Sequence, residues 1–382
     1  MGSNKKLKIA ILCDWYLPGY KAGGPIQSVA NLVASLDHEF DIITSDRDLG
    51  ETSAYKDITI DEWTKGKSEE RIIYLSPENQ NQSRYEDILG AEKYDAIYLN
   101  SMFSPAFSIK PMQAIRLLKL TDKVVLAPRG MLKSGAMAQK GWKKRAFLLI
   151  AKTLGWYKGI RWHATNDQEG DEIKNVFGQC DIRVAPNLVS NNGSIFSPTA
   201  KTSGVLKMIT VARISPEKNI LNAILFLNNM DFAATEVYWE IYGTQNDSAY
   251  LAQCQEAACH ISGAKIILKG EIQHNEIATK LSENHLFYLP TLGENYGHSI
   301  VESFLSGTPA LISDMTPWRN LTALNAGWDM PLERDRFSEK ITACVRMNQE
   351  EYDTWAKGAH TLGQEIAMDS EARTANNNLF LL

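Results

Sequence analysis

Short apolar runs alternate with segments of helical periodicity along most of the chain. The first run, residues 6–16, predicts a buried parallel strand. A glycine- and proline-rich loop follows, residues 26–36 repeat their apolar positions at helical spacing, and a further strand is predicted from residue 40. Strand, loop, helix and strand in this order form a βαβ unit. Further strands of the first half are predicted over residues 71–76, 95–101, 123–129, 161–165 and 182–187.

Residues 187–203 interrupt this alternation with a polar, Ser- and Asn-rich stretch that predicts a linker. A second alternation follows it, with strands predicted at residues 205–214, 237–243, 265–270, 285–290 and 308–314. A helix is predicted between each strand and the next, the first of them over residues 219–230. We therefore expect an N-terminal domain over residues 1–190 and a C-terminal domain over residues 204–359. The tail, residues 360–382, is expected to pack back on the first domain.

Strands joined by single helices favour right-handed crossovers and parallel sheets. A length of 382 residues also exceeds the size at which one core usually keeps growing. The predicted fold class is therefore α/β, with two Rossmann-like domains that each contain a parallel sheet. Ligands of open α/β sheets bind at the carboxyl ends of the strands, so the site is expected in the cleft between the domains.

The composition is that of an ordinary globular protein, with 44% hydrophobic and 22% charged residues. The net charge of -5 gives no reason to expect nucleic acid as a partner. Five cysteines form no CxxC pair, and the histidines show no metal-ligand spacing, so we expect no metal site. No run approaches the roughly 20 apolar residues of a membrane span, and we expect a cytoplasmic protein.

The sequence LPTLGENYGHSIVESFLSGTP carries the strongest local signal, in which Glu294 follows a buried strand and Glu302 lies on the next helix. Gly297 can adopt a positive φ in the turn between them. The first amides of a helix that begins near His298 can bind a diphosphate or a sugar hydroxyl. Two solvated glutamates on an ordinary loop and helix fit the same spacing, so the residues alone leave both interpretations open.

A second signal is TVARISPEKN, in which a strand delivers Arg213 and a proline turn then delivers Lys218. Two cations at the carboxyl end of a strand suit the two phosphates of a nucleoside diphosphate. Solvated basic residues on a surface turn are the alternative.

Two features of the first half are weaker. The glycine pair before Pro25, which includes Gly24, permits close approach of a ligand to the backbone, but it lacks the GxGxxG pattern of a dinucleotide site. Asp46 and Asp48 spell a DxD sequence that can hold a metal ion in other contexts. We interpret it here as a solvated loop after a strand.

Taken together, the AGGP loop, ARISPEKN, IYG, LKGEI and PTLGENYGHSIVESFLSGTP resemble retaining glycosyltransferases of family 4, the group 1 transferases, in order and spacing. The resemblance covers almost the whole chain. It implies the GT-B fold and a metal-independent transferase that needs no cofactor and takes a UDP- or GDP-sugar as donor. The implied acceptor is a glycan or a polyprenyl-diphosphate-linked saccharide, in the assembly of a bacterial surface polysaccharide.

The resemblance also implies roles for single residues. Arg213 and Lys218 would neutralise the departing diphosphate, Glu294 would hold hydroxyls of the donor sugar, and Glu302 would hold the ribose. The donor would also be lined by the N-terminal loop and by the turn between the two glutamates, at Gly24, Asn295, Tyr296, Gly297 and His298. Ala212, Asn295 and His298 depart from the usual family residues, which leaves the donor sugar open.

Residues 123–166 contain no acidic residue in an otherwise acidic chain. We expect Arg129, at the end of a strand, and Lys133 to face the acceptor. A basic segment with aromatic neighbours suits an anionic membrane surface, and the expected contacts are Trp142, Lys143, Lys144 and Arg145. A helix that packs its apolar face in the first domain and leaves its lysines in water is the alternative.

Two other functions share this architecture. A nucleotide-sugar 2-epimerase has two similar domains but needs carboxylates and a histidine for proton transfer. A non-catalytic binding protein closes on a small solute without turnover. Neither requires the cation pair of ARISPEKN together with Glu294 and Glu302, so the motifs favour the transferase.

Overall fold

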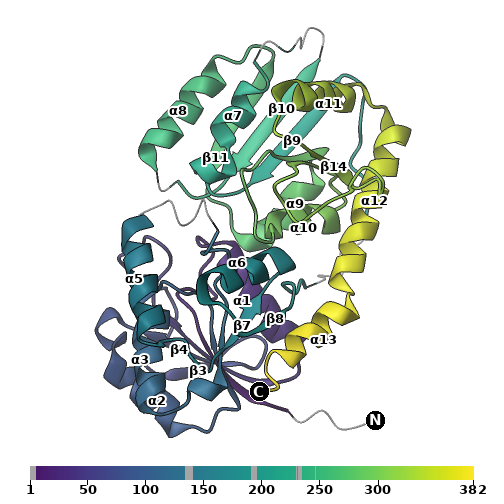
Figure 1. The fold of residues 1–382 in the computed structure, drawn as a ribbon. Coiled ribbons are helices and arrows are strands. Elements are labelled where there is room, and N and C mark those ends of the chain that lie inside the picture. The colour runs from purple at the N-terminus through teal and green to yellow at the C-terminus, as the bar shows by residue number, and fades with distance from the viewer. Residues whose placement is uncertain (1–5, 134–140, 191–195, 229, 231–234, 246) are drawn as a thin grey trace. The chain divides into compact units, whose positions relative to one another are not determined.

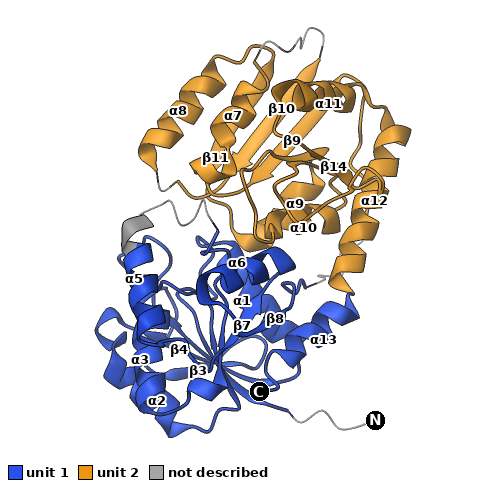
Figure 2. Cartoon of the chain, viewed as in Figure 1, with its two compact units in different colours: residues 1–190, 369–382 blue, residues 191–368 orange. Residues whose placement is uncertain are grey.

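The computed structural model describes residues 6–133, 141–190, 196–228, 230, 235–245 and 247–382, and the side chains of residues 141–143 lie outside this description. The chain divides into two compact units (Figure 2). Unit 1 consists of Met1–Ser190 and Asp369–Leu382, and unit 2 of Asn191–Met368. Each unit contains its own sheet with helices on both faces (Figure 1).

Within the described part of unit 1, eight strands form one sheet in the order β3-β4-β2-β1-β5-β6-β7-β8. All neighbours pair in parallel except β3 and β4, which are antiparallel. The strands are β1 (Lys8–Leu12), β2 (Glu39–Ser45), β3 (Trp63–Lys65), β4 (Arg71–Leu75), β5 (Ala96–Leu99), β6 (Val124–Leu126), β7 (Arg161–Ala164) and β8 (Asp181–Val184). The α-helices are α1 (Gly24–Ser35), α2 (Gln82–Ala91), α3 (Lys110–Leu117), α5 (Gly141–Thr153), α6 (Asp167–Phe177) and α13 (Ser370–Asn378).

The central strand β1 shows why this sheet is covered on both faces. Successive side chains of a strand point to opposite faces. Ile9 and Ile11 therefore belong to one buried cluster, and Ala10 and Leu12 belong to another. A continuous apolar run of this kind is typical of a parallel strand between two helical layers. The second layer includes the C-terminal helix α13, whose Ala372 lies in the same cluster as Ile9.

Among the described residues of unit 2, six parallel strands form a sheet in the order β11-β10-β9-β12-β13-β14. The strands are β9 (Val205–Val211), β10 (Glu236–Tyr242), β11 (Ala264–Gly270), β12 (Leu286–Leu289), β13 (Ala310–Ser313) and β14 (Gly327–Met330). The helices are α7 (Ile220–Leu225), α8 (Ser248–Cys259), α9 (His274–Ser282), α10 (His298–Leu305), α11 (Arg334–Arg346) and α12 (Gln349–Ala367).

A buried hydrogen-bond chain fixes the centre of this sheet. The indole of Trp239 on β10 donates to Thr210 Oγ1 on β9 at 3.0 Å, and the Thr210 hydroxyl donates to the carbonyl oxygen of Tyr288 on β12. All three residues are fully buried. Buried polar atoms are costly unless they are paired, so this chain ties together three neighbouring strands whose carboxyl ends carry the candidate site.

The predicted fold class is confirmed, because all strand pairs except β3 and β4 are parallel and helices connect most of the strands. Two strands were not predicted. The antiparallel edge strand β3 has three residues, and β14 has the sequence GWDM, which lacks both an apolar run and a clear alternation. The helix predicted over residues 219–230 is shorter in the structure, where α7 ends at Leu225. No described helix is long and apolar enough to cross a membrane.

Candidate functional site

The loops that follow β9 and β12 are joined by a short ion pair. Lys218 Nζ lies 2.6 Å from Glu294 Oε1, and the two side chains are only 13% and 10% exposed. The backbone supports the same junction, because the amide of Leu292 donates to the carbonyl oxygen of Glu217 at 2.9 Å. The structure therefore brings together two of the predicted residues that lie 76 positions apart in the chain.

The left-handed backbone conformation of Asn219 helps to place Lys218 beside Glu294. Pro216–Lys218 form a single 3-10 turn, and Asn219 follows it with φ 60°. Asparagine tolerates this conformation better than most residues do. The Asn219 side-chain amide then donates to the carbonyl oxygen of Pro290 at 2.8 Å, which fixes the turn against the end of β12.

Arg213 lies two residues beyond β9, on the same edge of the sheet as Lys218. Its guanidinium faces Glu217 at 3.7 Å, and both side chains are 49% exposed. Exposed pairs of this kind contribute little to stability. Arg213 can thus exchange this partner for a ligand phosphate at low cost.

The turn between the two glutamates leads directly into α10. Gly297 is its N-cap residue and has φ 81°, and a Cβ atom at this position would lie 2.8 Å from Ile300 Cδ1. Both the backbone conformation and the lack of space therefore call for glycine. Asn295 and His298 flank this turn and are partly exposed.

Tyr296 has a different position from its neighbours in the turn, because its side chain is 7% exposed. The Trp318 indole donates to the Tyr296 carbonyl oxygen, and the two rings meet edge-on at 5.2 Å. The ring of His298 lies 4.9 Å from that of Tyr296. Tyr296 therefore packs beneath the loop, whereas its neighbours Asn295 and His298 are partly exposed.

Glu302 lies in the second turn of α10, with its side chain 20% exposed. Burial raises the pKa of this carboxyl to about 7. His274, the first residue of α9, places Nδ1 3.7 Å from Glu302 Oε1, and burial lowers the pKa of its imidazole. A carboxyl with a raised pKa in a site of this kind is a functional candidate.

His274 is a site residue that the sequence analysis missed. It stands 28 positions before Glu302, and no motif links the two. Only the packing of α9 against α10 brings them together. The helical spacing of apolar residues in α9 predicts the helix, but it does not indicate which neighbour faces its first turn.

In unit 1, the glycine loop after β1 is held by Asp48. Its Oδ2 accepts hydrogen bonds from the amides of Tyr20 at 2.8 Å and Lys21 at 3.1 Å. The loop ends at Gly23, the N-cap of α1 with φ 63°, and Gly24 is the first helical residue. Asp46 pairs with the neighbouring Arg47. Both aspartates of the DxD sequence are buried, contrary to the solvated loop that was expected, and Asp48 supports the loop that leads to Gly24. The described residues contain no metal-binding group of three or more His, Cys, Asp or Glu side chains.

Arg129 lies three residues beyond β6 and has φ 57°. Its guanidinium donates to Asn100 Oδ1 at 2.6 Å, to the Tyr98 hydroxyl at 2.7 Å and to Asn187 Oδ1. These three partners are neutral, and a guanidinium carries five N–H donors. The group is thus held rigidly while its positive charge remains available to an anion.

A buried carboxylate positions the loop that contains Arg129. Glu169 is fully buried and accepts hydrogen bonds from the amide of Gly130, from the Thr165 amide at 2.8 Å and from the Thr165 hydroxyl at 2.6 Å. The predicted acceptor-side residue Lys133 is partly exposed and lies near Glu172 of α6. The role of Glu169 was not predicted, because in the sequence it is one of several acidic residues near the start of the same helix.

The predicted membrane contacts lie at the start of α5. The side chains of Trp142 and Lys143 are outside the described residues. Lys144 Nζ lies 5.4 Å from the centre of the Phe103 ring, and Arg145 is exposed. Phe147, Leu148 and Ala151 pack into the unit 1 core.

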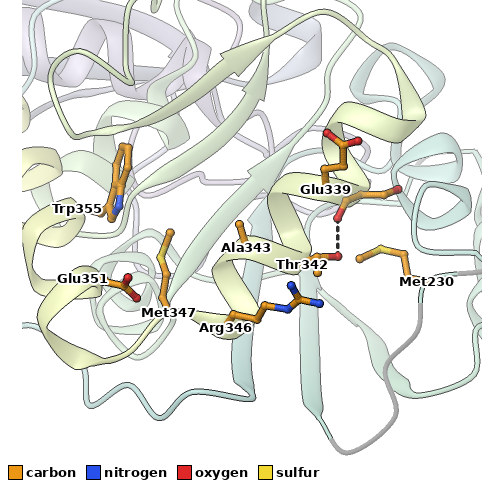
Figure 3. Close-up of a pocket in the computed structure, with 9 residues that line it drawn as sticks. Met230, Glu339, Thr342, Ala343, Arg346, Met347, Glu351 and Trp355 are labelled. Atoms are coloured by element: carbon orange, nitrogen blue, oxygen red, sulfur yellow. Dashed lines mark hydrogen bonds between the residues drawn. The ribbon is translucent and has the colours of Figure 1, made fainter.

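A separate groove of about 760 Å³ lies beside α11 and α12 (Figure 3). Its lining residues include Met230, Arg346, Met347 and Trp355. The end of α11 contacts the segment that leads into β9, because the Arg346 carbonyl oxygen accepts a hydrogen bond from the Ser203 hydroxyl. This groove is therefore at the amino end of β9, whereas Arg213 and Lys218 follow its carboxyl end.

Comparisons with known proteins agree with this geometry. The family model described as glycosyl transferases group 1 matches residues 191–360, which include every unit 2 residue of the candidate site. Over these residues the chain is similar to the group 1 glycosyltransferases. Nucleotide sugars are the donor substrates of group 1 glycosyltransferases. The resemblance to group 1 is thus confirmed for the C-terminal part of the sequence.

Solved structures extend the similarity to both units and show that the fold is of the GT-B type. Sucrose-phosphate synthase from Thermosynechococcus elongatus is similar with a TM-score of 0.72 and 14% identity over 98% of each chain. HepE of Anabaena, solved with UDP and glucose, has a TM-score of 0.69 and 14% identity over 98% of each chain. WaaG, described as a glycosyltransferase involved in lipopolysaccharide biosynthesis, has a TM-score of 0.62 and 13% identity over 97% of this chain and 99% of its own. At these identities the likeness shows the fold alone. A search of the curated proteins gave no match.

Proposed function

We propose that this protein is a glycosyltransferase that moves a sugar from a UDP- or GDP-sugar to a glycan or polyprenyl-diphosphate-linked acceptor, with retention of anomeric configuration. The observation that carries the proposal is the arrangement of Arg213, Lys218 and Glu294 at adjacent strand ends of unit 2. The donor diphosphate would lie against the two cations. Glu302 would bind the ribose, and Glu294 would bind the transferred sugar.

The charges on this edge suit the departure of a nucleoside diphosphate. Negative charge grows on the leaving group as the glycosidic bond breaks, so preset cations stabilise the transition state more than the ground state. Lys218 is already positioned by Glu294 at 2.6 Å, which lowers the cost of ordering its flexible side chain. No protein nucleophile is required if the acceptor attacks from the face that the diphosphate leaves.

Glu302 suits recognition of a ribose better than proton transfer to a distant group. An ionised carboxylate can accept hydrogen bonds from two adjacent hydroxyls. The helix position of Glu302 and the closeness of His274 at 3.7 Å limit its movement. The N-terminal amides of α10 and the partly exposed Asn295 and His298 would complete the donor pocket.

Acceptor recognition is assigned to unit 1. Arg129 is held by three neutral hydrogen-bond acceptors, which leaves its charge available for an acceptor phosphate. Lys133 lies four residues further along the same loop, and Gly24 begins α1 at another strand end of the sheet. A polyprenyl-diphosphate-linked acceptor would supply the anion that these residues bind.

A lipid-linked acceptor also implies work at a membrane. We propose a cytoplasmic enzyme that acts at the inner face of the plasma membrane in the synthesis of a bacterial surface polysaccharide. The basic residues at the start of α5, including Lys143, Lys144 and Arg145, would contact the anionic surface. HepE shares the fold and was solved with UDP and glucose, which supports the donor class. WaaG shares the fold and is described as involved in lipopolysaccharide biosynthesis, which supports the pathway.

A product assay tests the transferase proposal against the epimerase alternative. The protein is incubated with UDP- and GDP-sugars and with lipid-linked saccharide acceptors. A transferase releases nucleoside diphosphate only when acceptor is present, and it extends the acceptor by one sugar. The coupling constant of the new anomeric proton reports retention or inversion. Appearance of an epimeric nucleotide sugar without acceptor would instead establish the isomerase.

A further inference from the structure

Helix α5 has two apolar faces, and only one of them is covered by unit 1. Leu148 and Ala151 are 8% and 3% exposed and belong to the core. Leu149 and Ile150 on the helix and Leu154 just after it are 68%, 57% and 61% exposed. A helix that only packs its apolar residues against a core leaves polar residues outside. The outward side of α5 therefore requires a partner of its own.

Basic residues border the exposed apolar side chains. Arg145 and Lys152 are exposed, and a spacing of seven residues places them on the same edge of the helix, next to Leu149. Within the described residues neither has an ion-pair partner. Arg116 of α3 joins them from below, because its guanidinium donates to the carbonyl oxygens of Gly155 and Trp156 at 3.1 Å.

A pocket of mixed charge lies at the end of α5. This pocket has a volume of about 480 Å³, and both Lys152 and Lys158 line it. Lys158 is exposed, like Lys152. Asp122 and Asp181 also line this pocket, and Asp181 pairs with Arg161 at 2.9 Å, so the basic edge ends at Lys152 and Lys158.

We propose that this side of α5 docks on an anionic lipid bilayer, with Leu149, Ile150 and Leu154 in the head-group region and Arg145 and Lys152 against lipid phosphates. An amphipathic helix with apolar residues on one side and cations along its edge binds an anionic interface in this way. We call Arg145, Leu149, Ile150, Lys152 and Leu154 the docking face. The inference rests on the proposed function for the identity of the partner as a membrane, and it adds the apolar residues that enter it.

Charge favours a bilayer over a second copy of the chain. Residues 123–166 carry no acid, whereas the whole chain has a net charge of -5. In a two-fold symmetric dimer formed through this face, the same basic edge would recur on both sides of the interface. Like charges would then meet without an acid to pair them. An anionic bilayer supplies the complementary charge and also receives exposed apolar side chains.

Vesicle co-sedimentation of the full-length protein tests the docking face. The vesicles contain phosphatidylcholine alone or mixed with phosphatidylglycerol. One variant combines Leu149→Ser, Ile150→Ser and Leu154→Ser, and a second combines Arg145→Glu and Lys152→Glu. Matched controls change exposed residues elsewhere: Leu225→Ser with Leu324→Ser, and Lys93→Glu with Lys357→Glu.

We expect the unaltered protein to sediment with the anionic vesicles and not with the neutral ones. Each docking-face variant should lose roughly tenfold or more of this partition, and each control should retain it. Equal sedimentation of the docking-face variants and the unaltered protein would overturn the proposal. A docking-face variant that converts a dimer to a monomer in size-exclusion chromatography, with unchanged vesicle binding, would overturn it in favour of self-association.

Stabilisation by UDP or GDP is measured on the same variants. It reports the unit 2 site, which the substitutions do not touch. Retained nucleotide stabilisation with lost vesicle binding shows a folded protein and supports the docking face. Retained vesicle binding without any nucleotide stabilisation would contradict the proposed donor site and leave the docking face supported, so the two proposals fail separately.

Discussion

Lys218 and Glu294 form an ion pair of 2.6 Å that joins the loop after β9 to the loop after β12. Neither side chain is more than 13% exposed. A pair this well buried is costly to break on one side, because the remaining charge loses its partner. We therefore expect the pair to have two roles. It ties the two loops together, and it holds a cation for the diphosphate beside a carboxylate for the sugar.

A double-mutant cycle on this pair separates the two roles. Lys218→Ala and Glu294→Ala should each lower the free energy of unfolding, by about 2–4 kcal/mol, and the double variant should lose less than their sum. Donor turnover should fall roughly 100-fold or more in all three. Urea unfolding and steady-state kinetics give the two quantities, and strict additivity of the stability losses would contradict the buried pair.

Arg213 should behave differently from Lys218, because its side chain is half exposed and its partner Glu217 is 3.7 Å away. Arg213→Ala is expected to leave the midpoint of thermal unfolding within about 1–2 °C while it lowers kcat/KM for the donor roughly 100-fold. Arg346→Ala, at the groove shown in Figure 3, is the matched control and should leave kinetics unchanged. Normal turnover in Arg213→Ala would remove this residue from the proposed site.

The carboxyl of Glu302 should make the free energy of unfolding depend on pH. Burial raises the pKa of this group from 4.5 to about 7. Between pH 4.5 and pH 7, this carboxyl is therefore protonated in the folded state and ionised in the unfolded state. The stabilisation is complete below pH 4.5 and is lost as the pH rises through 7. Glu302→Gln should therefore be more stable than the unaltered protein at pH 8, by at most about 3 kcal/mol, and equal to it near pH 4.5.

The same carboxyl should make donor affinity depend on pH. Ribose recognition requires the ionised form as an acceptor of two hydroxyls, so the dissociation constant for UDP or GDP should fall between pH 6 and pH 8. Calorimetric titration at both pH values measures it. In Glu302→Gln the pH dependence should be lost together with most of the affinity. A Gln variant that binds nucleotide normally would contradict the ribose assignment.

Arg129 is expected to affect the acceptor and not the donor. Its guanidinium uses three hydrogen bonds in a fixed geometry, which the single ammonium of lysine does not reproduce. Arg129→Lys should raise KM for a diphosphate-linked acceptor roughly tenfold or more and leave nucleotide binding unchanged. Steady-state kinetics with the acceptor varied give the KM, and an effect on nucleotide binding of equal size would argue against the assignment.

Much of the fold was predictable because its strands are short apolar runs between helices. The run that contains β1 feeds two buried clusters, and a strand with both faces covered has to be apolar throughout. The edge strands β3 and β14 lack such runs, since an edge strand has fewer buried positions to fill. The predicted helix extended past the end of α7 because the apolar residues continue beyond Leu225, where the backbone forms a turn.

The candidate site was predictable only as far as local motifs reach. Arg213 and Lys218 follow one strand, and Glu294 and Glu302 are separated only by a turn and the start of α10, so each pair is visible as a pattern in the sequence. The contact between the two loops depends on the order of β9 and β12 in the sheet. His274 and Glu169 could not have been found in this way, because each acts through a neighbour that tertiary packing supplies. The outward apolar residues of α5 likewise become visible only when their exposure is known.

A thermal-shift screen tests whether unit 2 contains the proposed donor site. The purified protein is heated with UDP, GDP, ADP and their common sugar conjugates, and the screen is repeated with Glu302→Ala and with the control Glu339→Ala at the groove of α11. We predict that one nucleoside diphosphate stabilises the protein and Glu339→Ala by roughly 5 °C or more at 100 times its dissociation constant, and that Glu302→Ala loses this shift. Absence of a shift with every nucleotide, or an equal shift in Glu302→Ala, would contradict the donor site proposed at the carboxyl ends of β9 and β12.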